Sequence, residues 1–272
     1  MNTESKFVSV FLMFSVLFLS SVSAQEVEEE REFDYLPNSG KGPKHWGELK
    51  KEWSSCNSGN SQSPVDMSNS RVKVINKPVD LKVKYKPCAA LLKNRIRWPN
   101  CDVGSIVING TEYALQQAHW HSPSEHTING ISLAMELHMV HQNKQNKKMA
   151  VIGVLYNYGA PNDFLSKLTN DLASMVDQVG RKEVGVIDPN AMIKMGSNKY
   201  YTYMGSLTVP PCTEGVTWIL NKEVGSVSKD QAHALRVAVH DVSSNLRLMY
   251  AEQNARPVQP LNDRKVELYS PN

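Results

Sequence analysis

The sequence predicts a mainly β protein: one domain around a large, mostly antiparallel, twisted sheet with a few short peripheral helices. Two observations support this class. Short runs of β-branched and aromatic residues recur between Gly, Pro, Asn and Ser turn signals, whereas helical spacing of apolar residues is confined to two segments. A chain of 272 residues, 41% of them hydrophobic, is long enough to bury one sizeable core.

The predicted strands are short and numerous. They are residues 81–85, 105–110, 112–121, 132–141, 149–157, 199–208 and 215–221. Residues 228–239 predict a helix with Ser228 as N-cap. Residues 162–180 predict another that ends at Gly180. Its apolar positions recur at helical spacing: Phe164, Leu165, Leu168, Leu172 and Met175. No repeat or long linker divides the chain, so we expect a single domain.

The N-terminus has the pattern of a secretory signal peptide. Lys6 precedes an apolar run that is too short for a comfortable membrane span, and small residues follow up to Ala24. We therefore expect residues 1–24 to be removed, residues 25–39 to form an acidic flexible tail and residues 40–272 to form the folded domain. The expected destination is extracellular, or a plastid compartment reached through the secretory route, with no membrane anchor.

The charge pattern indicates small partners. The formal net charge is only +3, and Lys and Arg are scattered among acids without a basic stripe. This excludes the usual electrostatic signature of a nucleic-acid-binding protein. The oligomeric state stays open.

The secretory route makes the four cysteines candidates for disulfides, with three possible pairings. Cys56 lies in a Ser/Asn/Gly-rich loop and Cys212 follows two prolines, so a bond between these loops is plausible. Cys88 and Cys101 would then form the second pair, or stay reduced and packed. Asn109, in an Asn-Gly-Thr sequon, is a candidate glycosylation site, although many sequons stay unused.

Three histidines and two polar residues share strand faces. If 112–121 is extended, Gln117, His119 and His121 point to one side, and Glu136 and His138 share a face of the next strand. The connecting turn contains Asn-Gly and favours an antiparallel return. His138 is therefore expected to face the other two histidines.

Three neutral imidazoles leave one tetrahedral position open, the arrangement of a catalytic site for one Zn²⁺ ion. Gln117 and Glu136 are candidate acceptors for the second ring N–H of the ligands. A His-x-His pair alone is weak evidence, and the third histidine strengthens it. The other five histidines are interpreted as structural or surface residues: His45, His126, His141, His233 and His240.

At this point the chain resembles a known family. The motifs are "HWGEL" at 45–49, "QSPVD" at 62–66, "HWHSPSEHT" at 119–127, "ELHMVH" at 136–141, "GSLTVPPC" at 205–212 and "NARPVQPL" at 254–261. In this order they resemble the alpha-class carbonic anhydrases, most closely the plant branch. The resemblance covers nearly the whole chain after the tail.

The resemblance implies reversible hydration of carbon dioxide to bicarbonate and a proton, by attack of a zinc-bound hydroxide. His119, His121 and His138 would be the zinc ligands, supported by Gln117 and Glu136. A peptide-cleaving zinc hydrolase is disfavoured because the chain has no HExxH motif.

The resemblance also implies roles around the metal. Thr208 would accept a hydrogen bond from the hydroxide and donate its own proton to Glu125. Asn254 and Arg256 match a structural motif beneath the site, and Cys56–Cys212 matches a family disulfide. The carbon dioxide pocket would contain Val140, Val151, Leu207, Val209, Val216 and Trp218.

Two departures from the family pattern affect the expected activity. The family's Gly-His pair is missing where Arg95 runs directly into Ile96, so proton shuttling is expected to be impaired. Slow turnover without buffer, a deformed site and a lost coding segment remain open explanations. The second departure is Val209, which stands where active family members commonly have a second threonine.

The alternative function is that of a catalytically weak or inactive secreted storage or binding protein.

Overall fold

The computed structural model describes residues 32–76, 79–175, 181–193, 199–239 and 253–270. The helices are α1 (Trp46–Leu49), η1 (Lys51–Trp53), α2 (Ser55–Ser58), α3 (Asp163–Met175), η2 (Pro189–Met192) and α4 (Lys229–Val239). The strands are β1 (Val72–Ile75), β2 (Leu81–Tyr85), β3 (Cys88–Leu92), β4 (Ile96–Arg97), β5 (Gly104–Ile108), β6 (Thr111–His121), β7 (Thr127–Ile128), β8 (Ile131–Ser132), β9 (Met135–Gln142), β10 (Met149–Tyr158), β11 (Lys182–Ile187), β12 (Tyr200–Ser206), β13 (Glu214–Asn221), β14 (Gly225–Val227) and β15 (Val266–Tyr269).

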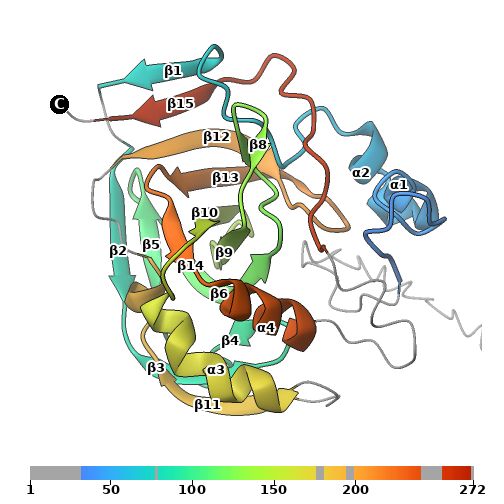
Figure 1. The fold of residues 1–272 in the computed structure, drawn as a ribbon. Coiled ribbons are helices and arrows are strands. Elements are labelled where there is room, and N and C mark those ends of the chain that lie inside the picture. The colour runs from blue at the N-terminus through green and yellow to red at the C-terminus, as the bar shows by residue number, and fades with distance from the viewer. Residues whose placement is uncertain (1–31, 77–78, 176–180, 194–198, 240–252, 271–272) are drawn as a thin grey trace, which may run out of the picture.

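One large curved sheet organises the molecule (Figure 1). Its main strand order is β1-β15-β12-β13-β10-β9-β6-β4-β3-β11, with β14 beside β10, and β5 joining β2 to β6. The prediction of a mainly β fold around a mostly antiparallel sheet is confirmed. The sheet is mixed, however, because β1 runs parallel to β15, and β10 runs parallel to both β13 and β14.

The seven predicted strands all lie in this sheet. Its other strands, β1, β3, β4, β11, β14 and β15, were not predicted, and neither were β7 and β8, which form a separate two-stranded sheet. Strand β10 is buried on both faces over its first eight residues, which matches its nearly continuous apolar sequence. Strand β4 has two residues and still pairs with β3 on one side and β6 on the other. The sheet therefore remains continuous at Arg95 and Ile96, where the resemblance led us to expect a Gly-His pair.

The two faces of the central strands have different roles. On β6 and β9, Trp120, Leu137 and Met139 enter the main apolar core. The alternate residues His119 and His138 point to the opposite face, because successive strand side chains alternate. The same strands thus supply core packing on one side and polar chemistry on the other.

Helices α3 and α4 lie together against the core face (Figure 1). The five apolar residues predicted for α3 are all buried. Asn162 caps this helix by accepting hydrogen bonds from the backbone of Phe164 and Leu165. Ser228 caps α4 through Gln231 N, as predicted. The predicted end at Gly180 lies outside the described residues.

The folded part begins earlier than the sequence predicted. Phe33 is 2% exposed and stacks edge-on against Trp46 and Trp53, with ring centroids 5.2 and 6.1 Å away. The expectation of a solvated tail through residue 39 is therefore wrong from Phe33 onward, because aromatic residues inside the acidic segment dock on α1 and η1. The predicted signal peptide lies outside the described residues. No described helix is long and apolar enough to cross a bilayer.

Both expected disulfides are present. Cys56 and Cys212 join across 156 residues with their Cα atoms 5.0 Å apart, and Cys88 and Cys101 join across 13 residues at 6.2 Å. No cysteine is left reduced among the described residues. Asn109 lies exposed in the turn between β5 and β6, with a positive φ of 49°.

Candidate metal centre

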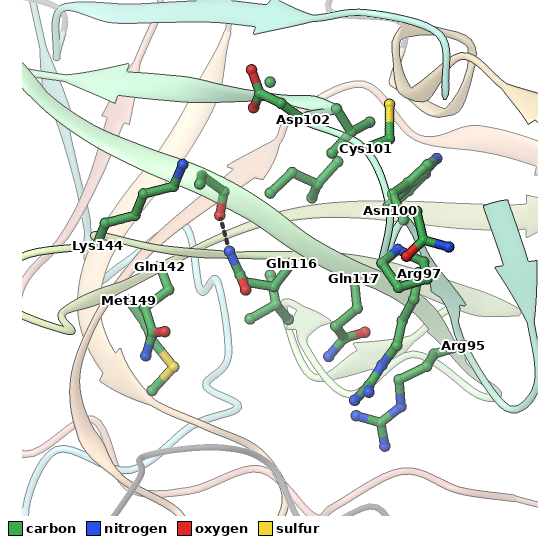
Figure 2. Close-up of a pocket in the computed structure, with 17 residues that line it drawn as sticks. Arg95, Arg97, Asn100, Cys101, Asp102, Gln116, Gln117, Gln142, Lys144 and Met149 are labelled. Carbon is green, nitrogen blue, oxygen red and sulfur yellow. Dashed lines mark hydrogen bonds between the residues drawn. The ribbon is translucent and has the colours of Figure 1, made fainter. Parts of the chain in front are cut away.

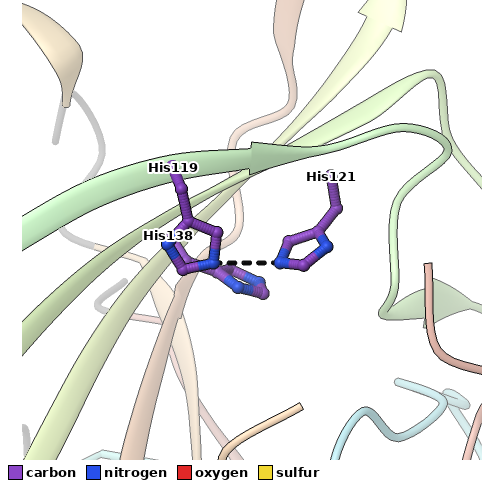
Figure 3. Close-up of side chains that lie close together, drawn as sticks. All are labelled: His119, His121 and His138. Atoms are coloured by element: carbon purple, nitrogen blue, oxygen red, sulfur yellow. Dashed lines mark hydrogen bonds between the residues drawn. The ribbon is translucent and has the colours of Figure 1, made fainter. Parts of the chain in front are cut away.

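Strands β6 and β9 bring the three predicted histidines together (Figure 3). His119 lies directly opposite His138 in the antiparallel register, and His121 follows two residues later on the same face. Nε2 of His119 and Nε2 of His121 are 3.0 Å apart. The three rings each offer a ligand atom, and these atoms all lie within 4.8 Å of one another. The sequence alternation thus produces a compact trio.

In His119 and His121 the ring nitrogen that points away from the trio, Nδ1, carries the proton. Nδ1 of His119 lies 2.7 Å from Gln117 Oε1, and Nδ1 of His121 lies 2.7 Å from the backbone oxygen of Asn254. Both partners are acceptors, so both Nδ1 atoms donate. Each Nε2 therefore carries a lone pair directed into the trio.

In His138 the two ring nitrogens have exchanged roles. Its Nε2 lies 2.7 Å from Glu136 Oε1 and donates to that carboxylate, so Nδ1 carries the lone pair. Gln117 and Glu136 stand where the sequence placed them as acceptors. The carbonyl of Asn254, which supports the third ring, was missed because a backbone acceptor 133 residues away leaves no local sequence signal.

The donor set fits a zinc ion. Two lone pairs 3.0 Å apart repel each other unless a cation lies between them. The pKa of His119 is held well below its usual range, first by loss of solvent around the ring and then by the repulsion that its protonated form would meet from protonated His121 or His138 and from Arg95. Neutral imidazole nitrogens with fixed second-shell hydrogen bonds suit a three-histidine zinc site with an open fourth position.

Glu136 is an ionised carboxylate at the centre of a buried network. Its Oε1 also lies 2.6 Å from Nδ1 of His126, and its Oε2 accepts from the backbone N–H groups of Glu125 and His126. Burial opposes ionisation, but His126 and His138 hold the pKa of Glu136 well below its usual range. His126 continues the network to the Tyr203 hydroxyl at 2.7 Å, which confirms its structural role.

Glu125 lies beneath the trio in a different environment. Its Oε1 accepts from the backbone N–H of Arg256 at 2.8 Å, and its Oε2 lies 3.9 Å from Nδ1 of His138. Burial raises the pKa of Glu125 to about 7, while His138 and the hydroxyl of Thr208 lower it. Oε2 is buried and makes no hydrogen bond of standard geometry with any described residue. It is therefore an acceptor for a nearby hydroxyl such as that of Thr208.

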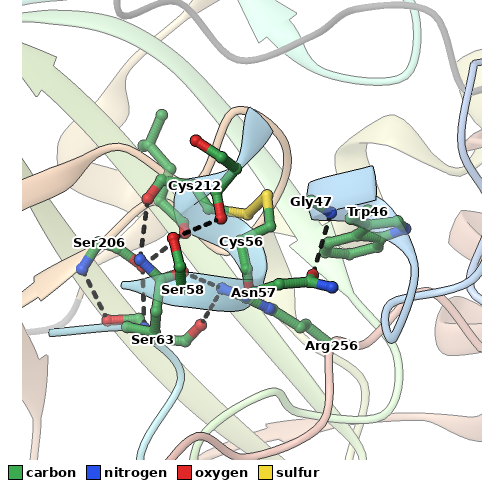
Figure 4. The surroundings of a disulfide bond; sticks show 12 residues. Trp46, Gly47, Cys56, Asn57, Ser58, Ser63, Ser206, Cys212 and Arg256 are labelled. Atoms are coloured by element: carbon green, nitrogen blue, oxygen red, sulfur yellow. Dashed lines mark hydrogen bonds between the residues drawn. A yellow bond between two sulfur atoms is a disulfide. The ribbon is translucent and has the colours of Figure 1, made fainter. Parts of the chain in front are cut away.

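Arg256 ties this region to the N-terminal segment (Figure 4). Its guanidinium donates to the carbonyls of Cys56 and Ser63 and to the side chain of Gln62. The Cys56–Cys212 bond lies in the same neighbourhood. The disulfide thus cross-links the loop that carries Thr208 to the N-terminal segment that the Arg256 side chain binds.

Five of the six predicted pocket residues pack together in one cluster: Val140, Val151, Leu207, Val216 and Trp218. Val209 packs instead with Cys56, Cys212 and the N-terminal aromatic residues. Its side chain is 8% exposed and contributes to a different cluster from the one expected, because the Pro-Pro-Cys turn directs it toward the disulfide.

The remaining predicted histidine assignments agree with the structure where it describes them. His141 is buried between the Tyr85 hydroxyl, at 2.5 Å, and the carbonyl of Ala150. His45 bonds Glu48 at the surface, and His233 is exposed on α4. His240 lies outside the described residues.

Similarity to known proteins agrees with this geometry. The family model for eukaryotic-type carbonic anhydrase matches residues 41–270. The chain is 48% identical to alpha carbonic anhydrase 7 of Arabidopsis thaliana, over 97% of this chain and 95% of that protein. It is 47% identical to carbonic anhydrase Nec1 of Nesocodon mauritianus, over 98% and 95% respectively.

Solved structures give the same result. Dioscorin in complex with ascorbate superposes with a TM-score of 0.81 at 36% identity, over 89% of this chain and 99% of dioscorin. The alpha-carbonic anhydrase of Thermovibrio ammonificans, in complex with the inhibitor sulfanilamide, superposes with a TM-score of 0.72 at 33% identity, over 86% and 98%. The large mixed sheet and its sequence place the chain in the class of carbonic anhydrase folds, with a candidate metal centre at the histidine trio. The chain belongs to the eukaryotic-type carbonic anhydrase family, whose activity is the hydration of carbon dioxide.

Proposed function

We propose that this protein is a zinc-dependent carbonic anhydrase in which His119, His121 and His138 hold one Zn²⁺ ion. The observation that supports this most strongly is the convergence of three neutral rings whose outer N–H groups are each bonded to an acceptor. In carbonic anhydrases, bound zinc is known to lower the pKa of its water to about 7, and so supplies hydroxide near neutral pH.

The chain's own residues would then orient the reaction. Glu125 would accept a hydrogen bond from the Thr208 hydroxyl. Thr208 Oγ1 would then be left to accept a hydrogen bond from the reacting hydroxide, and this would point a lone pair of the hydroxide at the carbon of carbon dioxide. This requires Glu125 to be ionised, and a cation held by the adjacent histidines would favour that form. The cluster that contains Val140, Val151 and Trp218 would hold carbon dioxide, which needs an apolar surface.

The last step, transfer of a proton to solvent, lacks its usual carrier in this chain. A carrier needs a pKa near ambient pH, which usually means histidine. The sequence contains no histidine between His45 and His119. We therefore propose that proton release depends on external buffer.

The experiment is stopped-flow carbon dioxide hydration by zinc-loaded protein, with and without imidazole. Imidazole should raise the rate, and His138→Ala should abolish activity and stoichiometric zinc binding. His233→Ala removes an exposed histidine on α4 and is the matched control, which should keep both. Full activity and zinc content in His138→Ala would refute the proposal.

The second candidate function is a ligand-binding family member with little hydration activity. The missing histidine and Val209 favour it, and dioscorin, whose solved complex contains ascorbate, is a structural relative. No hydration with or without imidazole, in a protein that still binds zinc, would support this alternative.

The proposed processing follows the sequence expectations. Residues 1–24 would be removed in the secretory pathway, leaving the acidic segment 25–32 before the domain, whose packed part begins at Phe33. The protein would act outside the cell or in a plastid compartment. The exposed turn position of Asn109 is compatible with glycosylation, and mass spectrometry of the secreted protein before and after glycosidase treatment tests this.

A further inference from the structure

Two hairpin turns carry the same three residues, Ile-Asn-Gly, at 108–110 and at 128–130. Both lie outside the hollow that Gln117 lines beside the metal centre (Figure 2). The first turn joins β5 to β6 and the second joins β7 to β8, each as a two-residue loop. Their backbones agree closely, because φ is 49° at Asn109 and 51° at Asn129, and both asparagines are exposed. The two turns are therefore a matched pair.

An asparagine followed by glycine can lose its side-chain amide. The backbone nitrogen of the glycine gives up its proton and bonds to Cγ of the asparagine. The bond from Cγ to Nδ2 then breaks, and Nδ2 takes up a proton and leaves as ammonia. Water opens the resulting cyclic imide at either carbonyl carbon, which leaves aspartate or isoaspartate. Glycine favours this reaction because it has no side chain to hinder the approach.

The attacked carboxamide is held in the same way in both turns. Asn109 Oδ1 accepts a hydrogen bond from the backbone N–H of Asp80 at 3.1 Å, and Asn129 Oδ1 accepts one from the backbone N–H of Asn69 at 2.8 Å. A donor at this oxygen stabilises the negative charge that develops there when nitrogen attacks Cγ. The carbon that is attacked is therefore prepared similarly in the two turns.

The attacking nitrogen is where the two turns differ. The Gly130 N–H donates to Oδ1 of Asp66 at 2.8 Å, and the same oxygen accepts from the Thr127 hydroxyl at 2.6 Å. In the part of the chain that the structure describes, the Gly110 N–H donates to no other group. A carboxylate bonded to an N–H opposes loss of that proton, because two negative charges would then lie side by side. Gly110 is therefore the more reactive nucleophile.

We propose that Asn109 is a site of spontaneous deamidation in chains that carry no glycan there, and that Asp66 protects the matching Asn129. A glycan would be attached to the same nitrogen, Nδ2 of Asn109, and would hinder its departure. The proposal concerns the unglycosylated chain and depends neither on glycosylation nor on carbon dioxide hydration. The isoaspartyl product has a free α-carboxyl group, so methyl transfer to that group is the class of reaction that would act on it.

The test uses zinc-loaded protein from the periplasm of a bacterium that attaches no N-glycan, where both disulfides can form. After incubation at mildly alkaline pH, peptide mass spectrometry measures conversion at each asparagine, and enzymatic transfer of a labelled methyl group measures isoaspartate. Asn109 should convert at least about tenfold faster than Asn129, because the Gly130 N–H must first leave a charged acceptor. In guanidinium chloride the two sites should convert at similar rates, since their local sequences match.

Two variants test the part played by Asp66. Asp66→Ala frees the Gly130 N–H and should speed conversion at Asn129 about tenfold without changing Asn109. Thr127→Val is the matched control, because it removes the other hydrogen bond to that carboxylate and should leave Asn129 protected. If Asp66→Ala fails to fold, Asp66→Asn keeps an acceptor without the charge and should speed conversion at Asn129 several-fold.

Equal conversion at the two turns of the folded protein would overturn the proposal, and so would an unreactive Asn109 in a protein whose denatured form converts. Unchanged protection of Asn129 in both Asp66 variants would do the same. Equal acceleration by Thr127→Val and Asp66→Ala would show that anchoring of the hairpin, and not the carboxylate, protects Asn129, and would remove the role assigned to Asp66.

Discussion

Glu136 Oε1 lies 2.7 Å from Nε2 of His138, and this contact determines which nitrogen of that ring faces the metal centre. The same oxygen lies 2.6 Å from Nδ1 of His126, and His126 in turn bonds Tyr203. One ionised carboxylate thus orients a candidate metal ligand and connects it to a buried network that extends to β12.

Replacement of this carboxylate should weaken metal binding. Glu136→Gln keeps the shape of the side chain but removes the charge, so His138 loses a strong acceptor for its Nε2–H. We expect zinc affinity to fall about 10- to 100-fold, the usual cost of removing a partner behind a metal ligand. Competition with a chelator measures this change. The control is Glu223→Gln at the surface, and equal affinities in the two variants would contradict the assigned role.

Thr208 and Glu125 should behave as one functional unit. Thr208→Ala and Glu125→Gln are each expected to lower kcat/KM for hydration about 10- to 100-fold with zinc content retained. The double variant should lose little more than either single variant, because each replacement already breaks the same relay. Stopped-flow kinetics on the three variants provides the double-mutant cycle. Multiplicative losses would show that the two residues act separately.

His141 should make stability depend on pH. Burial lowers its pKa from 6.5 to about 3, so between these values the unfolded chain binds a proton that the folded protein does not. The contribution of neutral His141 to the free energy of unfolding is therefore complete above about pH 6.5. It decreases as the pH falls, by up to about 1.4 kcal/mol per pH unit. In urea unfolding of zinc-loaded protein, the stability advantage of the wild type over His141→Gln should shrink below pH 6.5.

The matched control for this experiment is the exposed His233→Gln, which should follow the wild type at each pH. A constant difference between His141→Gln and the wild type from pH 7.5 to 5.5 would show that His141 does not stay neutral in the folded protein.

The long-range disulfide should contribute more to stability than the short one. The Cys56–Cys212 bond closes a loop of 156 residues and ties the Thr208 loop to the segment held by Arg256. The Cys56→Ser/Cys212→Ser double variant should lose about 2–5 kcal/mol of unfolding free energy in denaturant titrations. Cys88→Ser/Cys101→Ser should lose less, since its loop spans 13 residues. The reverse order would contradict the loop-closure argument.

The sequence by itself determined most of the candidate site. Strand alternation placed Gln117, His119 and His121 on one face, and the spacing of Glu136 and His138 placed the matching pair on the next strand. These relationships have a period of two and connect adjacent strands, so local pattern was sufficient to predict them. The motifs in chain order also identified the family.

Tertiary structure decided what local pattern does not encode. The carbonyl of Asn254 reaches His121 from 133 residues away, and the backbone N–H of Arg256 reaches Glu125. Backbone groups have no residue-specific signature, so the resemblance placed Asn254 and Arg256 beneath the site without indicating either contact. Only the folded sheet places Arg95 and Arg97 beside Gln117, because their positions depend on how β4 pairs with β6. Periodicity determines the face of a strand, whereas chain packing over long separations determines what that face meets.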